Sequence, residues 1–282
     1  MKKPQWITAG IALLLTFSLY AVTQNNIFGV KQRTAAPKSA TDHADHAHLS
    51  FDTILHHAKE ALKPEQVQRI AFLENSITRG DVPAQKLKVY HQLAHFWADT
   101  ANQLLPYAWY TAEAARLENS EKSLTFAARL FLNNLKQQES PELKHWMAEQ
   151  AKDLFDRSLT LNPGNDSAQV GLGATYLFGG LSNPMEGISK IRTVVEKDST
   201  NVYAQMTLGE ASMISSQFDK AIERFAKVVR LQPNNLEANL LLAETYERTG
   251  KKVEAVTWYK KSAGLTEIPQ LKEAVNQKIN VL

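Results

Sequence analysis

A repeated spacing of large and small residues in the second half of the chain constrains the fold more than any other feature. A leucine followed by a small residue recurs at Leu172–Gly173, Leu208–Gly209 and Leu242–Ala243, and the leucines are 36 and then 34 residues apart. The same steps recur at two further sets of positions, the small residues Ala151, Gly187, Ala221 and Ala255 and the large residues Phe155, Ile191, Phe225 and Tyr259. A period of this length predicts stacked pairs of antiparallel helices, in which the small residues allow close backbone approach.

The rest of the chain beyond Ser50 also has helical spacing, with breaks marked by Pro, Gly or Asn. The fold class is therefore predicted to be all-α. We expect helices at Phe51–Leu62, from Pro64 to Ile77, around Tyr90–Trp97, around Ala108–Ala115, at Leu124–Leu135, at Glu142–Leu161 and at Pro269–Val281. Gly80, within an Arg-Gly-Asp tripeptide, is expected to end the second of these helices as a C-cap rather than to serve adhesion.

The C-terminal repeats resemble the tetratricopeptide repeat (TPR). The residues that carry the resemblance are Ala204, Leu208, Gly209, Ala221, Phe225 and Pro233, and then Ala238, Leu242, Ala243, Tyr246, Ala255 and Tyr259. The match is clear over residues 143–261 and divergent upstream to residue 89. The resemblance implies a right-handed α-solenoid of helix-turn-helix repeats, with TPR repeats at 136–265, a divergent helical region at 49–135 and a C-terminal capping helix at 266–282.

One repeat, Asp166–Thr200, carries two extra residues before its second helix. Pro184 is expected to begin that helix, because proline is favoured in the first turn, where its missing N–H costs nothing. Asn183 or Ser182 is the expected N-cap.

The N-terminus is predicted to be a signal anchor at residues 1–23, followed by a flexible tether at 24–48. Lys2 and Lys3 precede an apolar run at residues 7–22, and no good small-residue cleavage site follows. We expect a single-pass membrane protein with the solenoid on the outer side, which is the periplasm if the host is bacterial. The alternative is an exported soluble protein after signal cleavage.

Catalysis and cofactor binding have little support in the sequence. The chain has no cysteine, and no nucleophile motif, phosphate loop or acid/base pair is present, so we expect no enzyme and no cofactor. Gly171-Leu172-Gly173 is explained by repeat packing rather than nucleotide binding, and His91 and His95 lack the glutamate of a metallohydrolase helix. Two alternatives stay open: metal handling by His43, His46 and His48 in the tether, and an enzyme site in the divergent N-terminal helices.

Binding of a protein or peptide is the predicted function, in a scaffold or adaptor for envelope assembly. The net charge is only +3, with both signs mixed along the chain, so nucleic acid is not the expected partner. By resemblance, the first helices of the repeats line a concave groove at Val170, Ala174, Leu177, Phe178, Tyr203, Met206, Glu210, Met213, Leu240, Glu244 and Glu247. This groove is expected to be apolar with an acidic end, suited to an amphipathic helix or extended apolar peptide with basic flanks. Val170, Ala174, Met206, Thr207, Glu210, Glu237 and Leu241 do not supply the basic clamp that binds chaperone tails. No pattern in the sequence predicts the oligomeric state.

Overall fold

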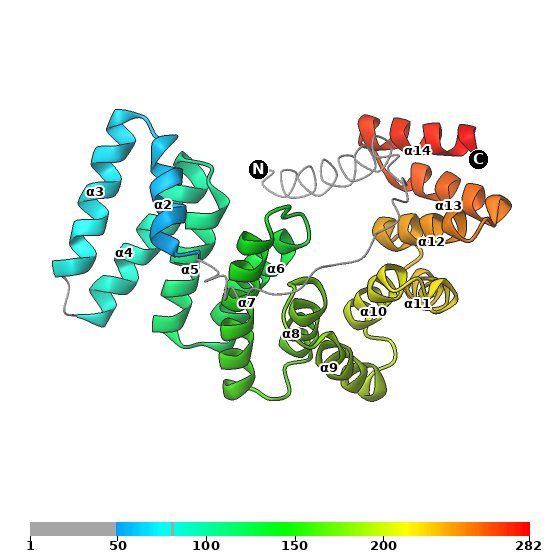
Figure 1. The fold of residues 1–282 in the computed structure, drawn as a ribbon, viewed down its shortest axis with the longest axis horizontal. Coiled ribbons are helices and arrows are strands. Elements are labelled where there is room, and N and C mark those ends of the chain that lie inside the picture. Colours follow the sequence, from blue (N-terminus) through cyan, green and yellow to red (C-terminus); the bar gives the residue numbers. More distant parts are fainter. Residues whose placement is uncertain (1–48, 80–81) are drawn as a thin grey trace, which may run out of the picture. The chain divides into compact units, whose positions relative to one another are not determined.

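The computed structural model describes residues 49–79 and 82–282, and within them all regular structure is helical. The helices are α2 (Phe51–Glu60), α3 (Pro64–Arg79), α4 (Pro83–His95), the π-helical turn η1 (Phe96–Thr100), α5 (Leu104–Glu118), α6 (Glu121–Leu135), α7 (Pro141–Leu161), α8 (Asp166–Phe178), α9 (Pro184–Lys197), α10 (Val202–Ile214), α11 (Phe218–Leu231), α12 (Leu236–Arg248), α13 (Lys252–Leu265) and α14 (Pro269–Val281) (Figure 1). The predicted all-α class is confirmed for this part of the chain.

The described residues fall into two compact units that divide within α10. The N-terminal unit comprises the described residues up to 207, and the C-terminal unit comprises residues 208–282. In the N-terminal unit, α4 packs on α5, α6 on α7 and α8 on α9, as successive helix pairs (Figure 1). In the C-terminal unit, each of α11, α12 and α13 packs on the next helix along the chain.

Glycines set the separation of the packed helices, as the repeat pattern predicts. A Cβ atom added to Gly173 in α8 would lie 2.7 Å from the carbonyl oxygen of Gly187 in α9. In the C-terminal unit, a Cβ on Gly209 would lie 2.5 Å from the ring of Phe225, which is fully buried. No side chain fits at these positions without displacing a neighbour, so the recurring small residues are a condition of close helix packing.

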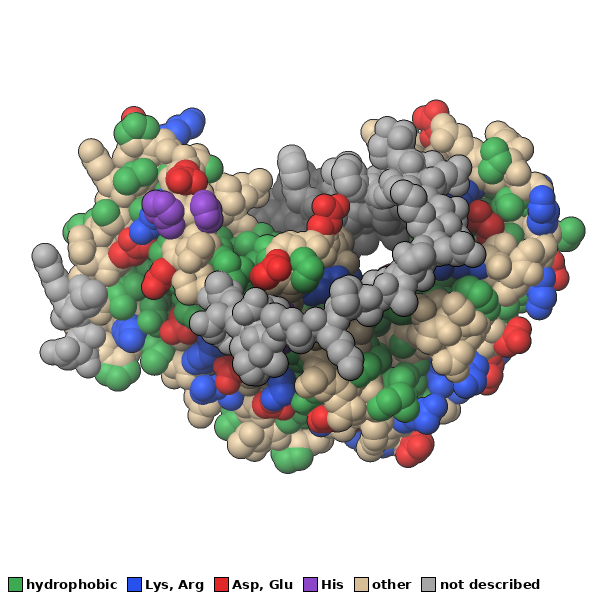
Figure 2. Space-filling model, in the orientation of Figure 1, with side chains coloured by type: hydrophobic (Ala, Val, Ile, Leu, Met, Phe, Trp, Pro, Cys, Tyr) green, Lys and Arg blue, Asp and Glu red, His purple; other side chains and the backbone are tan. Residues whose placement is uncertain are grey.

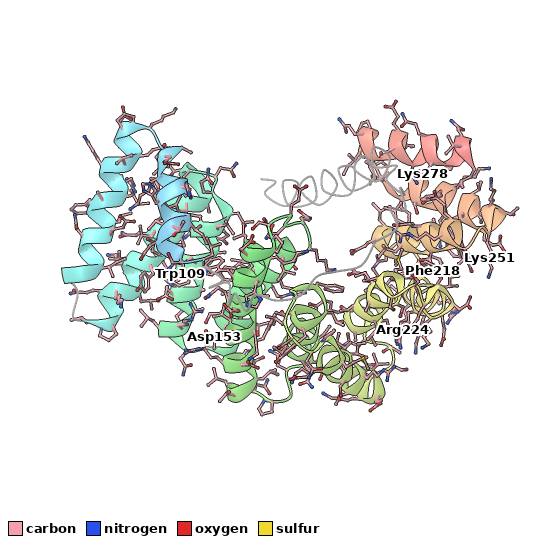
Figure 3. The ribbon with its side chains drawn as sticks, viewed as in Figure 1. Trp109, Asp153, Phe218, Arg224, Lys251 and Lys278 are labelled. Carbon is pink, nitrogen blue, oxygen red and sulfur yellow. The ribbon has the colours of Figure 1, made fainter. Side chains whose placement is uncertain are left out.

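An aromatic stack joins α2, α5 and α7 in the N-terminal unit. The ring of Trp109 stacks on Phe51 at a centroid distance of 4.3 Å and on Trp146 at 5.9 Å. The guanidinium of Arg116 lies 5.8 Å from the Trp109 ring centroid and also binds Asp153 of α7 (Figure 3). Stacking and cation–π contacts of this kind each contribute about 0.5–1.5 kcal/mol. They fix α2 to the repeat region.

The C-terminal unit ends on α14, as the sequence predicts. Leu271 and Val275 of α14 are buried against α12 and α13, in a cluster that includes Leu240, Ala243 and Tyr259. A helix at the end of a repeat array covers an apolar face that the last repeat leaves exposed. The predicted solitary helix at Pro269–Val281 is therefore present with those bounds.

The start of α9 agrees with the sequence prediction. Pro184 begins α9, and the N-cap is Asn183, whose side chain accepts a hydrogen bond from the backbone N–H of Glu186 at 3.3 Å. The predicted cap at Gly80 and the expected anchor and tether lie outside the described residues. Among the helices of residues 49–79 and 82–282, none has the length and apolar character needed to cross a bilayer.

Candidate functional site

The predicted groove residues of the N-terminal unit lie on α8 and at the start of α10. Val170 and Ala174 are buried, at 0% and 2% exposure, and Met206 is nearly so. Leu177, Phe178 and Tyr203 are half-buried and remain accessible. The accessible part of this predicted surface is therefore made mainly of two aromatic rings and one leucine.

Helix α6 supplies residues to the same surface that sequence reasoning did not identify. The Arg129 guanidinium lies 5.1 Å from the ring centroid of Tyr203, and the Lys136 ammonium lies 4.5 Å from the ring centroid of Phe178. Phe126, one helical turn before Arg129, is 52% exposed. We refer to Phe126, Arg129, Lys136, Phe178 and Tyr203 as the α6 surface; it combines exposed apolar area with two cations.

The arrangement follows from the helical period of α6. Its buried residues, among them Leu124, Ala128 and Phe131, face the core. At 100° per residue, Phe126, Arg129 and Lys136 fall within about 80° of one another on the opposite side. The helix pair that contains α6 diverges from the TPR pattern, so the sequence does not indicate which face of α6 belongs to the groove. The small pair Ala127–Ala128 followed by Phe131 was the available signal, since it resembles the Leu-Gly and Leu-Ala pairs of the later repeats.

A cavity of about 240 Å³ adjoins the α6 surface at Phe126, between α4, α5 and α6. Its lining residues are His91, Ala94, His95, Tyr107, Thr111, Ala114, Ala115, Glu118, Ser123 and Phe126. Of these, Ala94, Ala114 and Ala115 are buried and apolar. An engineered apolar cavity of about 150 Å³ binds benzene, so this cavity has room for one large side chain of a partner.

The two histidines of this cavity are each close to a carboxylate. His91 Nε2 lies 2.9 Å from Glu118 Oε1, and His95 Nδ1 lies 3.4 Å from Asp99 Oδ2. Burial raises the pKa of the Tyr107 phenol above its ordinary value, so this group stays neutral and can donate a hydrogen bond. In the part of the chain that the structure describes, no three His, Asp or Glu residues are grouped to hold a metal ion. His43, His46 and His48 lie outside that part.

The predicted groove residues of the C-terminal unit lie at the end of α10 and on α12. Met213 and Leu240 are each 7% exposed, and Glu210, Glu244 and Glu247 are half-buried. The C-terminal unit therefore offers little accessible apolar area at these positions.

The acidic end of this predicted groove is largely neutralised within the unit. Arg248 Nη2 donates to Glu244 Oε1 at 2.7 Å, and Lys278 Nζ of α14 donates to Glu247 Oε1 at 2.9 Å (Figure 3). The buried phenol of Tyr259 donates a second hydrogen bond to Glu247, at 2.6 Å. On the face shown in Figure 2, acidic and basic side chains of this unit are interspersed rather than gathered by sign. The paired carboxylates have little residual charge with which to attract a basic ligand.

The helices are arranged in successive pairs that pack closely through small residues. This arrangement defines a helical-repeat protein. The family profile described as Tetratricopeptide repeat matches residues 212–263. Residues 212–263 therefore have the character of tetratricopeptide repeats, and proteins with such repeats bind protein or peptide partners. A TPR-type protein-interaction scaffold is the role that these repeats support.

Solved structures of repeat proteins are similar to the chain at low identity. A MamA fragment from Desulfovibrio magneticus RS-1 is 24% identical, with a TM-score of 0.45, over 66% of this chain and 96% of that one. YrrB, described as a TPR protein with an unusual peptide-binding site, is 18% identical, with a TM-score of 0.42, over 73% of this chain and 97% of that one. No curated protein matches the sequence.

Proposed function

We propose that the chain is a membrane-tethered scaffold that binds a peptide or helix of a partner protein, in an assembly process of the cell envelope. The binding site in this proposal is the α6 surface with its adjoining cavity. The observation that carries it is the exposure of Phe126 at 52%, at the rim of a cavity large enough for one side chain. Buried anchor side chains contribute most of the binding energy at such interfaces.

The membrane part of the proposal depends on the apolar run at residues 7–22, which follows two lysines. A tether at residues 24–48 would connect the anchor to the repeats. In this arrangement the repeats remain within reach of a membrane-bound partner, which raises its effective concentration without any new contact.

Site-specific photocrosslinking tests the proposed surface. A photoreactive residue is placed at Phe126 of the full chain in its native membranes, and in a matched variant at Phe72 of α3, which is 71% exposed. Both positions are exposed phenylalanines of the N-terminal unit, so only their surroundings differ. We expect a discrete adduct from position 126 and none from position 72.

Comparing the crosslinks from positions 126 and 72 shows whether the partner binds specifically at the α6 surface. Equal labelling at both positions, or labelling at neither, contradicts the proposed site. A soluble competitor peptide taken from the crosslinked partner should abolish the adduct at position 126. If it does not, the contact is an encounter at the membrane rather than binding to the α6 surface.

A further inference from the structure

The cavity beside Phe126 owes its depth to short side chains. It lies between α4, α5 and α6, which follow one another in the N-terminal unit (Figure 1). Ala94 of α4 and Ala114 and Ala115 of α5 line it, with exposures of 6%, 1% and 2%. A longer side chain at any of these positions would occupy the open space. The cavity is therefore a product of helix packing, and its size restricts which side chain of a partner can enter.

The volume of the cavity matches a side chain with two fused rings. A cavity of about 150 Å³ holds benzene, which has six ring atoms, so the nine ring atoms of an indole require about 225 Å³ in proportion. This cavity measures about 240 Å³. A single phenyl ring or a leucine would leave about a third or more of the space empty, and the lining would lose the corresponding dispersion energy. Tryptophan is the side chain that fills the cavity best.

Aromatic rings also line the cavity. They belong to His91 and His95 of α4, Tyr107 of α5 and Phe126 of α6, and Phe126 is 52% exposed. Pairs of aromatic rings attract one another beyond the area that they bury, in offset-stacked and edge-to-face arrangements. This lining favours an aromatic side chain over an aliphatic one of equal volume.

The histidines and Glu118 supply acceptors of hydrogen bonds. A carboxylate can only accept, so in its neutral form His91 donates from Nε2 to Glu118 Oε1, and His95 donates from Nδ1 to Asp99. The other nitrogen of each ring is then an acceptor, as is the second oxygen of Glu118. Glu118 is the least exposed of the three lining side chains, at 30% against 50% for His91 and 78% for His95.

Two of the hydroxyl donors of the cavity are already used. The hydroxyl of Thr111 donates to the carbonyl oxygen of Tyr107 at 2.8 Å, and that of Ser123 donates to the carbonyl oxygen of Ser120 at 3.1 Å. The phenol of Tyr107 can accept as well as donate. A side chain that supplies a donor and no acceptor therefore matches the cavity, and the indole N–H is such a donor. Lysine and arginine also only donate, but their charge is costly to remove from water.

We propose that the cavity beside Phe126 binds a tryptophan of the partner protein, with the indole rings against Ala114, Ala115 and Phe126 and the indole N–H donated to Glu118. This inference rests on the proposed function and names the anchor residue of its ligand. The partner is recognised by the shape of the ring and by one hydrogen bond, rather than by its charge.

The test begins with a selection from a displayed library of random peptides of about sixteen residues, or about four helical turns. The full chain in lipid nanodiscs is the target, and we expect the selected peptides to be enriched in tryptophan. In the strongest peptide, this tryptophan is replaced by alanine and, separately, by benzothienylalanine, which has the same two rings with sulfur in place of the N–H. The dissociation constant should rise at least about thirty-fold for alanine and about five- to ten-fold for benzothienylalanine. These replacements leave the protein unchanged, so its folding does not affect the result.

A cavity-filling variant tests the position of the tryptophan. Thr111→Leu places a larger side chain in the cavity, and the dissociation constant should rise at least about ten-fold. The matched control is Thr257→Leu in α13, at an exposed helical threonine whose hydroxyl also donates to the carbonyl oxygen four residues earlier, at 2.8 Å. There the dissociation constant should stay within about two-fold. Circular dichroism should be unchanged in both variants.

The hydrogen bond is tested by combining changes in the protein and the peptide. Glu118→Met should weaken the tryptophan peptide about five- to ten-fold and leave the benzothienylalanine peptide unaffected, because the two changes remove the same contact. The control is Glu60→Met in α2, at another exposed glutamate that lies beside a histidine, 3.2 Å from His57. It should weaken neither peptide.

Four results would overturn the inference. Selected peptides that lack tryptophan, or that carry arginine in its place, leave the proposed function standing and remove this ligand. Equal affinity for the tryptophan and benzothienylalanine peptides removes the hydrogen bond and with it the preference for indole. Equal affinity of the wild type and Thr111→Leu shows that the peptide binds outside the cavity. If no peptide is enriched at all, peptide binding itself fails, together with the proposed function.

Discussion

At the scale of single residues, Gly173 shows how one methyl group can decide the separation of two helices. We expect Gly173→Ala to destabilise the protein by about 1–3 kcal/mol, because the new Cβ would meet the backbone oxygen of Gly187, which no rotamer change can move. Thermal unfolding followed by circular dichroism measures the effect as a fall of several degrees in Tm.

The matched control is Gly264→Ala in α13, where an added Cβ has no heavy atom within 4 Å. There alanine relieves the entropic cost of a helical glycine, so we expect a gain of about 0.5–1 kcal/mol. A gain of stability at Gly173 as well would mean that helix propensity outweighs the contact between α8 and α9.

Asp153 gives a residue-scale prediction on pH. Partial burial acts to raise its pKa, but hydrogen bonds from Arg157 and Arg116 together outweigh burial and hold the pKa below the ordinary value of 3.8. A carboxyl group with a lowered pKa stabilises the folded state above its unfolded pKa, and this contribution is lost as pH falls through the folded pKa. Because Asp153 is 41% exposed, the contribution is at most about 1 kcal/mol.

The measurement is the difference in Tm between wild type and Asp153→Asn from pH 7 to pH 2.5. We expect the wild type to be the more stable above pH 3.8, and the difference to shrink below it. A difference that is constant over the whole range would contradict the role of the Arg116 and Arg157 contacts.

At the scale of elements, α14 is held by a small number of buried side chains. Leu271→Ala should cost about 2–4 kcal/mol, because Leu271 is fully buried against α12 and α13. Since this is the last helix of the array, we expect local rather than global opening, seen as faster amide hydrogen exchange in α13 and α14. Val281→Ala, at a position that is 77% exposed, should leave exchange unchanged.

Exchange that accelerates equally in α4 and α5 after Leu271→Ala would show that the two units unfold together. That result would contradict a capping role confined to the C-terminal unit. Leu271 and Val275 belong to a buried cluster formed by this unit's own helices, which favours the local outcome.

At the scale of the whole molecule, the expected anchor can be tested by extraction. We expect the full chain to stay in the membrane pellet after alkaline carbonate treatment, and a variant lacking residues 1–23 to be released, because that variant lacks the apolar run of the expected anchor. A variant lacking residues 24–48 but keeping the anchor should stay in the pellet. A mature N-terminus found by mass spectrometry after residue 23 would establish cleavage and contradict a permanent anchor.

The sequence alone predicted the helical class, most helix positions and the TPR character of the C-terminal repeats, because these depend on local periodicity and on repeated small residues such as Gly173 and Gly209. It also placed Pro184 at the start of α9 and Pro269 at the start of α14. Those features depend on residues that are close together in the chain, so they can be predicted without knowledge of distant contacts.

Only the tertiary structure decided which side chains remain accessible and which distant groups contact one another. Arg129 meets Tyr203, and Lys278 meets Glu247, across 74 and 31 positions of sequence. Electrostatic partners at such separations are set by how the helices stack, and no local pattern encodes them. For this reason the acidic end expected in the groove is neutralised, whereas the basic α6 surface appears in a repeat whose sequence had diverged.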